Sequence, residues 1–275
     1  MFRIFRRIRN EILDGTRKNR YLLYAAGEVA LVIIGILIAL QINNWNEQRI
    51  EQNEIREYAL NLSAAIERDL EMLMPVEMQI RASIRQAELM AEYIRDRDVQ
   101  EMQNAELFFL TTHIGYRPYA WNRAALEQLK SVGGLRRMKN RELAQRIADY
   151  DALTRHLDQD YIEDEEAARD ILELIYQLID INYDRNGLED ILNWEDGFTA
   201  DDIERRLTQF RDTAVFSRLS EMRKPVLSQD LATFRRFANV NREFADSVKA
   251  RPDIELPRLR EFAEEILALI DEEYR

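Results

Sequence analysis

The sequence predicts an all-α protein in which one transmembrane helix continues into a multi-helix extracytoplasmic bundle. Three observations indicate this fold class. Glycine and proline are scarce, at 8 and 5 of 275 residues, and no glycine lies between Gly35 and Gly115, whereas β-rich proteins need turn residues far more often. One long segment near the N-terminus is almost wholly apolar. Much of the remaining chain repeats apolar residues at the three- and four-residue spacing of amphipathic helices.

Composition and charge exclude several classes of function. The chain contains no cysteine, which excludes disulfides, cysteine-ligated zinc and thiol catalysis. Its net charge of −12 argues against a nucleic-acid-binding surface, so no nucleic-acid partner is expected. The charge is uneven: residues 1–20 hold seven basic and two acidic residues, a net +5, so the remaining 255 residues carry −17. This asymmetry is a signal of membrane topology.

The apolar segment at residues 21–44 has the length and flanks of a transmembrane helix. The 21 residues from Tyr24 to Trp45 rise about 31 Å as an α-helix, close to the roughly 30 Å of bilayer hydrocarbon. Tyr21 and Tyr24 at one end and Trp45 at the other are placed as interfacial anchors. The alternatives are a buried core helix, for which the segment is too long and apolar, and a cleaved signal peptide. No small-residue cleavage site follows the segment, so we expect an uncleaved signal anchor.

Basic residues set the expected orientation of this helix. Seven precede the span, whereas the fifteen residues after it contain two, Arg49 and Arg56. The positive-inside rule then places the N-terminus in the cytoplasm. The sequence thus predicts a cytoplasmic segment at 1–20, a transmembrane helix at 21–44 and an acidic extracytoplasmic helical domain at 45–275.

Residues 1–14 are a second candidate membrane element. Ile4, Phe5, Ile8 and Ile12 share one arc of a helical wheel, opposite basic residues. A helix of this kind lies in the membrane interface and attracts anionic lipid. The alternative is an unstructured basic tail that only sets topology. The side chains expected to contact lipid headgroups are Arg3, Arg6, Arg7 and Arg9.

Glu28 is the one formally charged residue within the span. Gly35 and Ala39 follow it by seven and eleven residues and therefore lie within about 20° of it around the helix. A charge and a small-x-x-x-small motif on one stripe favour self-association, with Glu28 at the helix interface. Two alternatives remain open. In one, Glu28 snorkels to the headgroups or pairs with a nearby basic residue; in the other, it lines an ion or proton path.

Beyond Trp45 the helix is expected to continue without a break to about Met74, where Pro75 ends it and a second helix follows. The pair Gly133–Gly134 predicts a helix stop, and Asn140 predicts the next helix start. Apolar residues at helical spacing define the core faces of the later helices. These residues are Leu143, Ile147, Tyr150, Leu157, Tyr161, Ile171, Leu174, Ile175, Leu178, Ile179, Phe234, Phe237, Phe244, Val248, Phe262, Ile266, Leu269 and Ile270.

Three patterns imitate ligand sites. Residues 180–193 resemble the start of an EF-hand, but Glu189 and Asn193 occupy positions that require an aliphatic residue and a bidentate Glu, so we interpret the stretch as a turn. The acidic run at 158–166 can hold a cation loosely, and we interpret it as a solvated face. His113 and His156 lack metalloprotease spacing, so a histidine metal site needs carboxylates distant in the sequence.

Aromatic residues surround Pro118, and they either line a pocket or partner surface or form a structural plug. These residues are Tyr116, Tyr119 and Trp121. No serine-hydrolase elbow, Walker loop or dinucleotide fingerprint occurs in the sequence. We therefore predict that the protein is not an enzyme, and we assign no catalytic, cofactor-binding or metal-ligating residue.

Two stretches resemble a family of uncharacterised bacterial single-span membrane proteins, grouped under a domain of unknown function. The first, YLLYAAGEVALVIIGILIALQINNWNE at 21–47, carries the family signature at Tyr24, Gly27, Glu28, Gly35, Gln41, Asn43, Asn44 and Trp45. The second, at 120–151, is similar at Leu129, Gly133, Leu135, Asn140 and Leu143, and departs from the family pattern at Leu126, Val132 and Met138. The resemblance implies a helical protein anchored in the bacterial inner membrane. It brings no reaction or cofactor.

Three functional hypotheses follow. The first is a membrane-anchored, self-associating scaffold, adaptor or sensor module with its main domain in the periplasm. The second is a homo-oligomeric pore or channel-like effector with Glu28 at the helix interface. The third, with least support, is a hydrolase in the outer domain. The partners expected are the lipid bilayer, further copies of the chain and a protein that binds the outer domain.

Overall fold

The computed structural model describes residues 17–111, 115–183, 205 and 208–275. All regular structure in this part of the chain is helical and it contains no strand, which confirms the all-α prediction. The chain divides into two compact units, Met1–Glu57 and Tyr58–Arg275. The predicted boundaries at residues 20 and 44 remain predictions.

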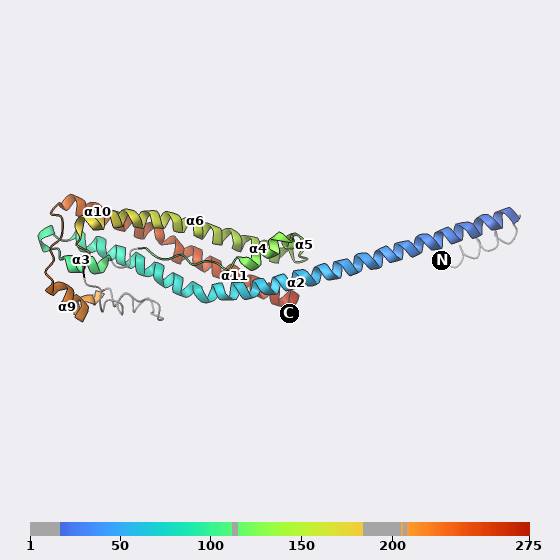
Figure 1. Cartoon of the computed structure of the whole chain (residues 1–275), viewed down its shortest axis with the longest axis horizontal. Coiled ribbons are helices and arrows are strands. Elements are labelled where there is room, and N and C mark those ends of the chain that lie inside the picture. Colours follow the sequence, from blue (N-terminus) through green and yellow to red (C-terminus); the bar gives the residue numbers. More distant parts are fainter. Residues whose placement is uncertain (1–16, 112–114, 184–204, 206–207) are drawn as a thin grey trace. The chain divides into compact units, whose positions relative to one another are not determined.

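Helices of very different length make up the described chain (Figure 1). Longest is α2, with 79 residues. The elements are α2 (Arg17–Arg95), η1 (Val99–Glu101), α3 (Asn104–Leu110), α4 (Ala124–Ser131), α5 (Gly134–Arg137), α6 (Arg141–Leu178), η2 (Phe210–Asp212), α9 (Ala214–Glu221), α10 (Leu231–Val248), η3 (Arg251–Glu255) and α11 (Leu256–Tyr274).

Helix α2 contributes residues to both units and contains Pro75 in its interior. The prediction that the helix ends near Met74 is therefore wrong. Pro75 is exposed, whereas Leu73 and Val76 beside it are buried. The carbonyl of Glu71, which loses its partner because proline has no N–H, thus lies on the solvent side where water can bond it. Because Leu73 and Val76 are both packed in the core, the helix continues through the proline without ending.

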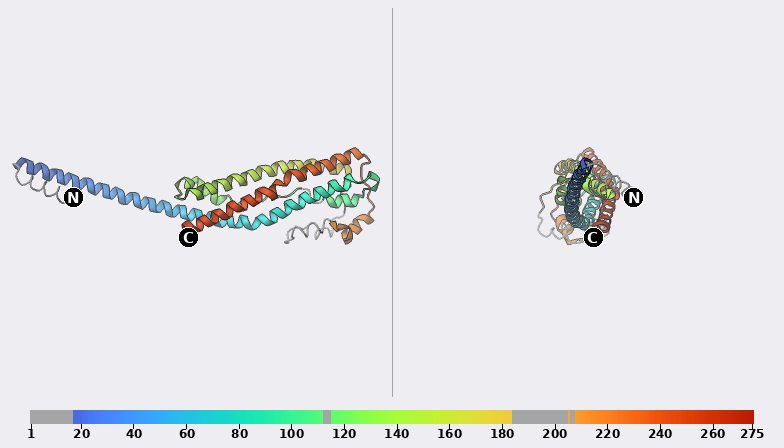
Figure 2. Two further views of the ribbon diagram at one scale, coloured as in Figure 1. Left: turned by 180° about the vertical axis from the view of Figure 1, so that it is seen from behind. Right: turned by 90° about the vertical axis from the view of Figure 1, so that its right-hand side faces the viewer.

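In the second unit, α10 and α11 both pack against α6. Figures 1 and 2 show these helices side by side with the later part of α2. Ion pairs join that part of α2 to the C-terminal segment. Arg81 Nη1 lies 2.9 Å from Asp253 Oδ1, and Lys249 Nζ lies 2.9 Å from Glu88 Oε1. These helices form one bundle around a shared core.

The core of the second unit is built mainly from aromatic and branched aliphatic side chains. Phe234, Phe237 and Phe244 of α10 are at most 2% exposed. Each such side chain contributes roughly 1.5–3 kcal/mol when buried. Most residues expected in the core are buried; Leu157, Tyr161 and Leu269 are half-buried. The periodicity of the sequence thus indicates the inward faces of α6, α10 and α11 correctly.

The chain between α4 and α6 confirms the predicted helix stop and start. Gly133 has a φ of 67°, a left-handed conformation that favours glycine. At Gly134 an added Cβ would lie 2.3 Å from Leu129 Cδ1, so no larger residue fits there without rearrangement. Asn140 begins α6 as the N-cap, because its side chain accepts a hydrogen bond from the Leu143 N–H at 3.0 Å.

Candidate functional site

The first candidate site is the apolar segment of α2 in the first unit. Its large apolar side chains from Val29 to Ile42 are 51% to 71% exposed. An 18-residue window here has a mean hydropathy of 2.3 and no buried residue. By length and composition this is one long apolar helix that is able to cross a membrane. A signal sequence near the N-terminus has the same properties.

The predicted interface stripe lies within this exposed segment. Glu28, Gly35 and Ala39 all belong to α2 and are all exposed. A Cβ added at Gly35 would meet nothing within 4 Å. Within the described structure, then, the small-residue face of the helix is open to close approach.

The predicted anchors and headgroup contacts are only partly described. Tyr24 and Trp45 are 80% and 65% exposed, as interfacial anchors would be. Tyr21 lies in α2, but its side chain is outside the described residues, as are the four arginines expected at the headgroups. The latter are Arg3, Arg6, Arg7 and Arg9.

The second candidate site is a group of five charged or titratable side chains between α6 and η3. We call it the acidic cluster. The helix α6 positions three members on one face because they follow one another at intervals of four residues. η3 is a π-helical turn, a rare element that is frequent at functional sites. The acidic cluster consists of His156, Asp160 and Asp164 from α6, and Arg251 and Glu255 from η3.

This arrangement corrects the interpretation of residues 158–166 as a solvated face. Asp160 and Asp164 are only 6% and 4% exposed, whereas Glu163, Glu165 and Glu166 are exposed. The reason is the helical period: residues four apart point inward together, and the residues between them face solvent. Two of the six acidic residues in this run therefore belong to the protein interior.

Arg251 is the central cation of the acidic cluster. Its Nε and Nη2 donate to the two carboxylate oxygens of Asp164, at 3.2 and 3.3 Å. Its Nη1 donates to Glu255 Oε1 at 3.2 Å and lies 3.5 Å from Asp160 Oδ2. The Tyr116 hydroxyl donates to Asp164 Oδ2 at 2.7 Å. Asp164 is thus fully bonded, whereas Asp160 and Glu255 share one guanidinium nitrogen.

Burial and like charge act on the remaining carboxyls. Burial raises the pKa of the Glu255 carboxyl above its ordinary value; Arg251 opposes this shift and Asp160 adds to it. Burial, together with the hydrogen bond to Asp164, also raises the pKa of Tyr116. The cluster therefore holds more negative charge than its one arginine neutralises.

His156 stands at the solvent edge of the acidic cluster. Its side chain is 58% exposed, and its Nε2 lies 3.4 Å from Asp160 Oδ2 and 3.8 Å from Glu255 Oε1. The ligand atoms of His156, Asp160 and Glu255 all lie within 4.8 Å of one another. The structure thus supplies the distant carboxylate that a histidine metal site requires. His113 lies outside the described residues.

The sequence carried part of the signal for this cluster. His156 and Asp160 have the i, i+4 spacing that places two ligands on one helix face. Glu255 lies 95 residues beyond Asp160 in the chain. Nothing local to α6 indicates it, because the pairing depends on how α10 returns the chain to α6.

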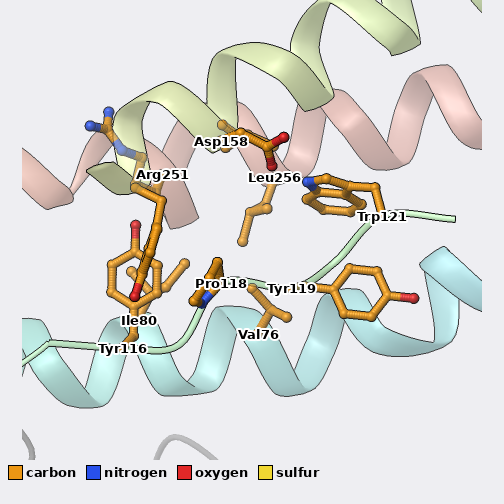
Figure 3. A pocket seen from close by; sticks show the side chains of 11 residues that line it. Val76, Ile80, Tyr116, Pro118, Tyr119, Trp121, Asp158, Arg251 and Leu256 are labelled. Atoms are coloured by element: carbon orange, nitrogen blue, oxygen red, sulfur yellow. The ribbon is translucent and has the colours of Figure 1, made fainter. Parts of the chain in front are cut away.

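The aromatic residues around Pro118 line a small cleft next to the acidic cluster (Figure 3). Arg251 and Asp158 also line it, and its volume of about 30 Å³ has room for one or two water molecules. Tyr116 is bonded to Asp164, and Tyr119 donates to Asp69 Oδ1 at 3.0 Å. The segment therefore behaves as a plug between α2 and α6, and the cleft is too small for an organic substrate.

Asp69 of α2 is a further buried carboxylate, 3% exposed, outside the acidic cluster. It accepts hydrogen bonds from the hydroxyls of Tyr119 and Tyr150 at 3.0 and 2.8 Å. Asn122 donates to it from its backbone N–H at 3.1 Å and from its side-chain amide at 2.6 Å. Each carboxylate oxygen is therefore satisfied, which indicates a structural role in tying the plug segment and α6 to α2.

The EF-hand-like stretch at 180–193 is described only as far as Tyr183. Asp180, which would stand near its start, pairs instead with Lys224 Nζ at 2.8 Å. The hydrogen bond to Lys224 lowers the pKa of the Asp180 carboxyl. The remaining positions, including Glu189 and Asn193, lie outside the described residues.

Comparison with known proteins gives one match. Residues 28–112 match a family of unknown function (DUF6090). No curated protein and no solved structure matches the chain. The match covers most of α2 and the chain through α3, so it includes most of the apolar segment and the start of the second unit. The chain is therefore similar, over residues 28–112, to a family to which no function is assigned.

Proposed function

We propose that this protein is a non-enzymatic, membrane-anchored helical module that self-associates and serves as a scaffold, adaptor or sensor, with its main domain in the periplasm. The observation that carries this proposal is the exposure of every large apolar side chain between Val29 and Ile42. An exposed apolar surface of this extent is unfavourable in water. Lipid, or further copies of the same helix, would bury it.

The placement in the membrane rests on the ends of the apolar segment. Exposed aromatic residues, Tyr24 and Trp45, stand at its two limits. The excess of basic residues before it supports a cytoplasmic N-terminus, and the bacterial inner membrane follows from the family resemblance. The outer domain then begins soon after Trp45.

Self-association rests on the stripe of Glu28, Gly35 and Ala39. Lipid does not drive helices together by the hydrophobic effect, so close contact at small residues and bonding of polar groups supply the attraction. Glu28 in hydrocarbon gains most from a partner helix that offers it a hydrogen bond. The same stripe would line the pore of the second hypothesis, for which cation conductance is the distinguishing property.

The test is the mass of the full chain in lipid nanodiscs, measured by native mass spectrometry. The wild type is expected to be an oligomer, and Gly35→Leu to be mostly monomeric because the added side chain prevents close approach of the helices. Ala30→Leu is the matched control, since Ala30 lies about 140° around the helix from Gly35.

A monomeric wild type would contradict self-association and the pore together. If Gly35→Leu remains oligomeric, the helix interface does not lie at the stripe of Glu28, Gly35 and Ala39. A cation conductance in planar bilayers that changes in Glu28→Gln would support the pore hypothesis and contradict the scaffold proposal.

A further inference from the structure

Two buried oxygens of the acidic cluster accept no hydrogen bond, although Arg251 Nη1 makes an ion-pair contact with one of them at 3.5 Å. They are Asp160 Oδ2 and Glu255 Oε2. Asp160 is 6% exposed, and its Oδ2 points to the solvent edge of the cluster, 3.4 Å from His156 Nε2. A buried acceptor without a partner is unfavourable and uncommon in folded proteins. Two such oxygens beside an accessible imidazole form a convergent set of donor atoms for a cation.

The charge of the acidic cluster has the sign and size that a divalent ion balances. Asp160, Asp164 and Glu255 carry −3 when ionised, and Arg251 returns +1. A neutral His156 contributes a lone pair and no charge. The resulting −2 lies largely out of solvent, where unbalanced charge is unfavourable.

We propose that His156, Asp160 and Glu255 bind one divalent transition-metal ion of the zinc class. Their ligand atoms already lie within 4.8 Å of one another, and a tetrahedral site with bonds of about 2.1 Å separates its ligands by about 3.4 Å. The 3.4 Å between His156 Nε2 and Asp160 Oδ2 meets this value. A small rotation of the Glu255 side chain brings in the third ligand.

The donor set selects the class of metal. One imidazole with two carboxylates suits Zn²⁺ and its neighbours, whereas Ca²⁺ and Mg²⁺ prefer oxygen alone. Three protein ligands leave a fourth position for water, as in open zinc sites. The exposed His156 provides the path of entry.

Arg251 supports this site by pairing with its carboxylates and orienting them. Two of its nitrogens donate to Asp164, which also accepts from Tyr116, so Asp164 fixes the position of the guanidinium. Its Nη1 bonds Glu255 Oε1 and leaves Oε2 free. Hydrogen bonds of this kind orient ligating carboxylates in metal sites.

The experiment is an isothermal calorimetric titration of Zn²⁺ into the full chain in non-ionic detergent. Before the titration, the affinity tag is removed and bound metal is stripped from the protein with a chelator. We expect one Zn²⁺ per chain. His156→Gln and Glu255→Gln are each expected to weaken binding at least about tenfold. Co²⁺ should give the visible absorption of a tetrahedral site, and His156→Gln should abolish it.

Glu163→Gln is the matched control, because it removes an exposed carboxylate from the same helix outside the cluster. It should bind Zn²⁺ as the wild type does. His156 is exposed, so His156→Gln should keep the wild-type circular dichroism and separate loss of a ligand from loss of fold. Absence of saturable Zn²⁺ binding, equal affinity in His156→Gln and wild type, or equal competition by Mg²⁺ would each overturn the proposal.

Discussion

At the scale of single residues, the polar interior of the second unit depends on carboxylates that serve different purposes. Asp69 accepts hydrogen bonds from four donor groups and is fully satisfied, whereas Asp160 Oδ2 has ion-pair contacts but no hydrogen bond. The first pattern is that of a structural node, and the second is that of a group available to a ligand. A metal ion is therefore expected at the acidic cluster and not at Asp69.

The tyrosines that donate to Asp69 should make the stability of the fold depend on pH in the alkaline range. Burial, with a further contribution from Asp69, raises the pKa of Tyr119 to about 12 and raises that of Tyr150 as well. Unfolded tyrosine titrates near 10. A raised folded-state pKa contributes stability below pH 10 that is lost as pH rises toward the folded value. The free energy of unfolding should therefore fall between about pH 10 and 12.

Substitution Tyr150→Phe measures this contribution. At pH 8 we expect the variant to be less stable than the wild type by about 2 kcal/mol, since Asp69 loses a charge-assisted bond. The difference should shrink above pH 10, as followed by urea unfolding and circular dichroism. Tyr176→Phe, at a tyrosine that is 58% exposed, is the control and should change little. A difference between wild type and Tyr150→Phe that stays constant to pH 12 would contradict the linkage.

Sequence periodicity could not predict these nodes. It indicates which apolar residues face inward, but Asp69 meets partners 50 to 81 residues away, and Asp160 and Glu255 come from separate helices. A polar residue on a buried face looks like a solvated one until its partners are located. The two misassigned residues of the acidic run, Asp160 and Asp164, have this cause.

At the scale of elements, helix starts and stops with local chemistry were predictable. Asn140 and Gly133 act through their own backbone neighbours, and both predictions are confirmed. Pro75 is different, because the disruption that it causes depends on where the freed carbonyl points. The buried residues Leu73, Val76 and Ile80 carry α2 past it.

This account of α2 predicts that Pro75→Ala stabilises the protein. The substitution restores a backbone N–H to the carbonyl of Glu71 in a helix that is already formed, and Pro75 is exposed, so no core contact is lost. We expect a gain of about 1–3 kcal/mol in the free energy of unfolding. Urea unfolding in detergent measures it. A loss of stability would show that the proline is needed for the course of the helix.

At the scale of the whole molecule, the sequence predicted the fold class and one long apolar helix near the N-terminus. Both follow from composition and periodicity, which act along the whole chain. Function does not follow from them, and the match over residues 28–112 adds no activity. Membrane anchoring, orientation and self-association therefore stand as proposals that rest on the exposed apolar face of α2.

The absence of cysteine from the sequence allows the most direct test of the membrane proposal. Thr16→Cys and Ser131→Cys each introduce a single thiol, the second at an exposed position at the end of α4. Bacterial spheroplasts that produce either variant are treated with a membrane-impermeant maleimide before and after permeabilisation. We predict that Ser131→Cys is labelled in intact spheroplasts and Thr16→Cys only after permeabilisation. Labelling in the reverse order, or equal labelling of both in intact spheroplasts, would contradict a membrane anchor with a cytoplasmic N-terminus.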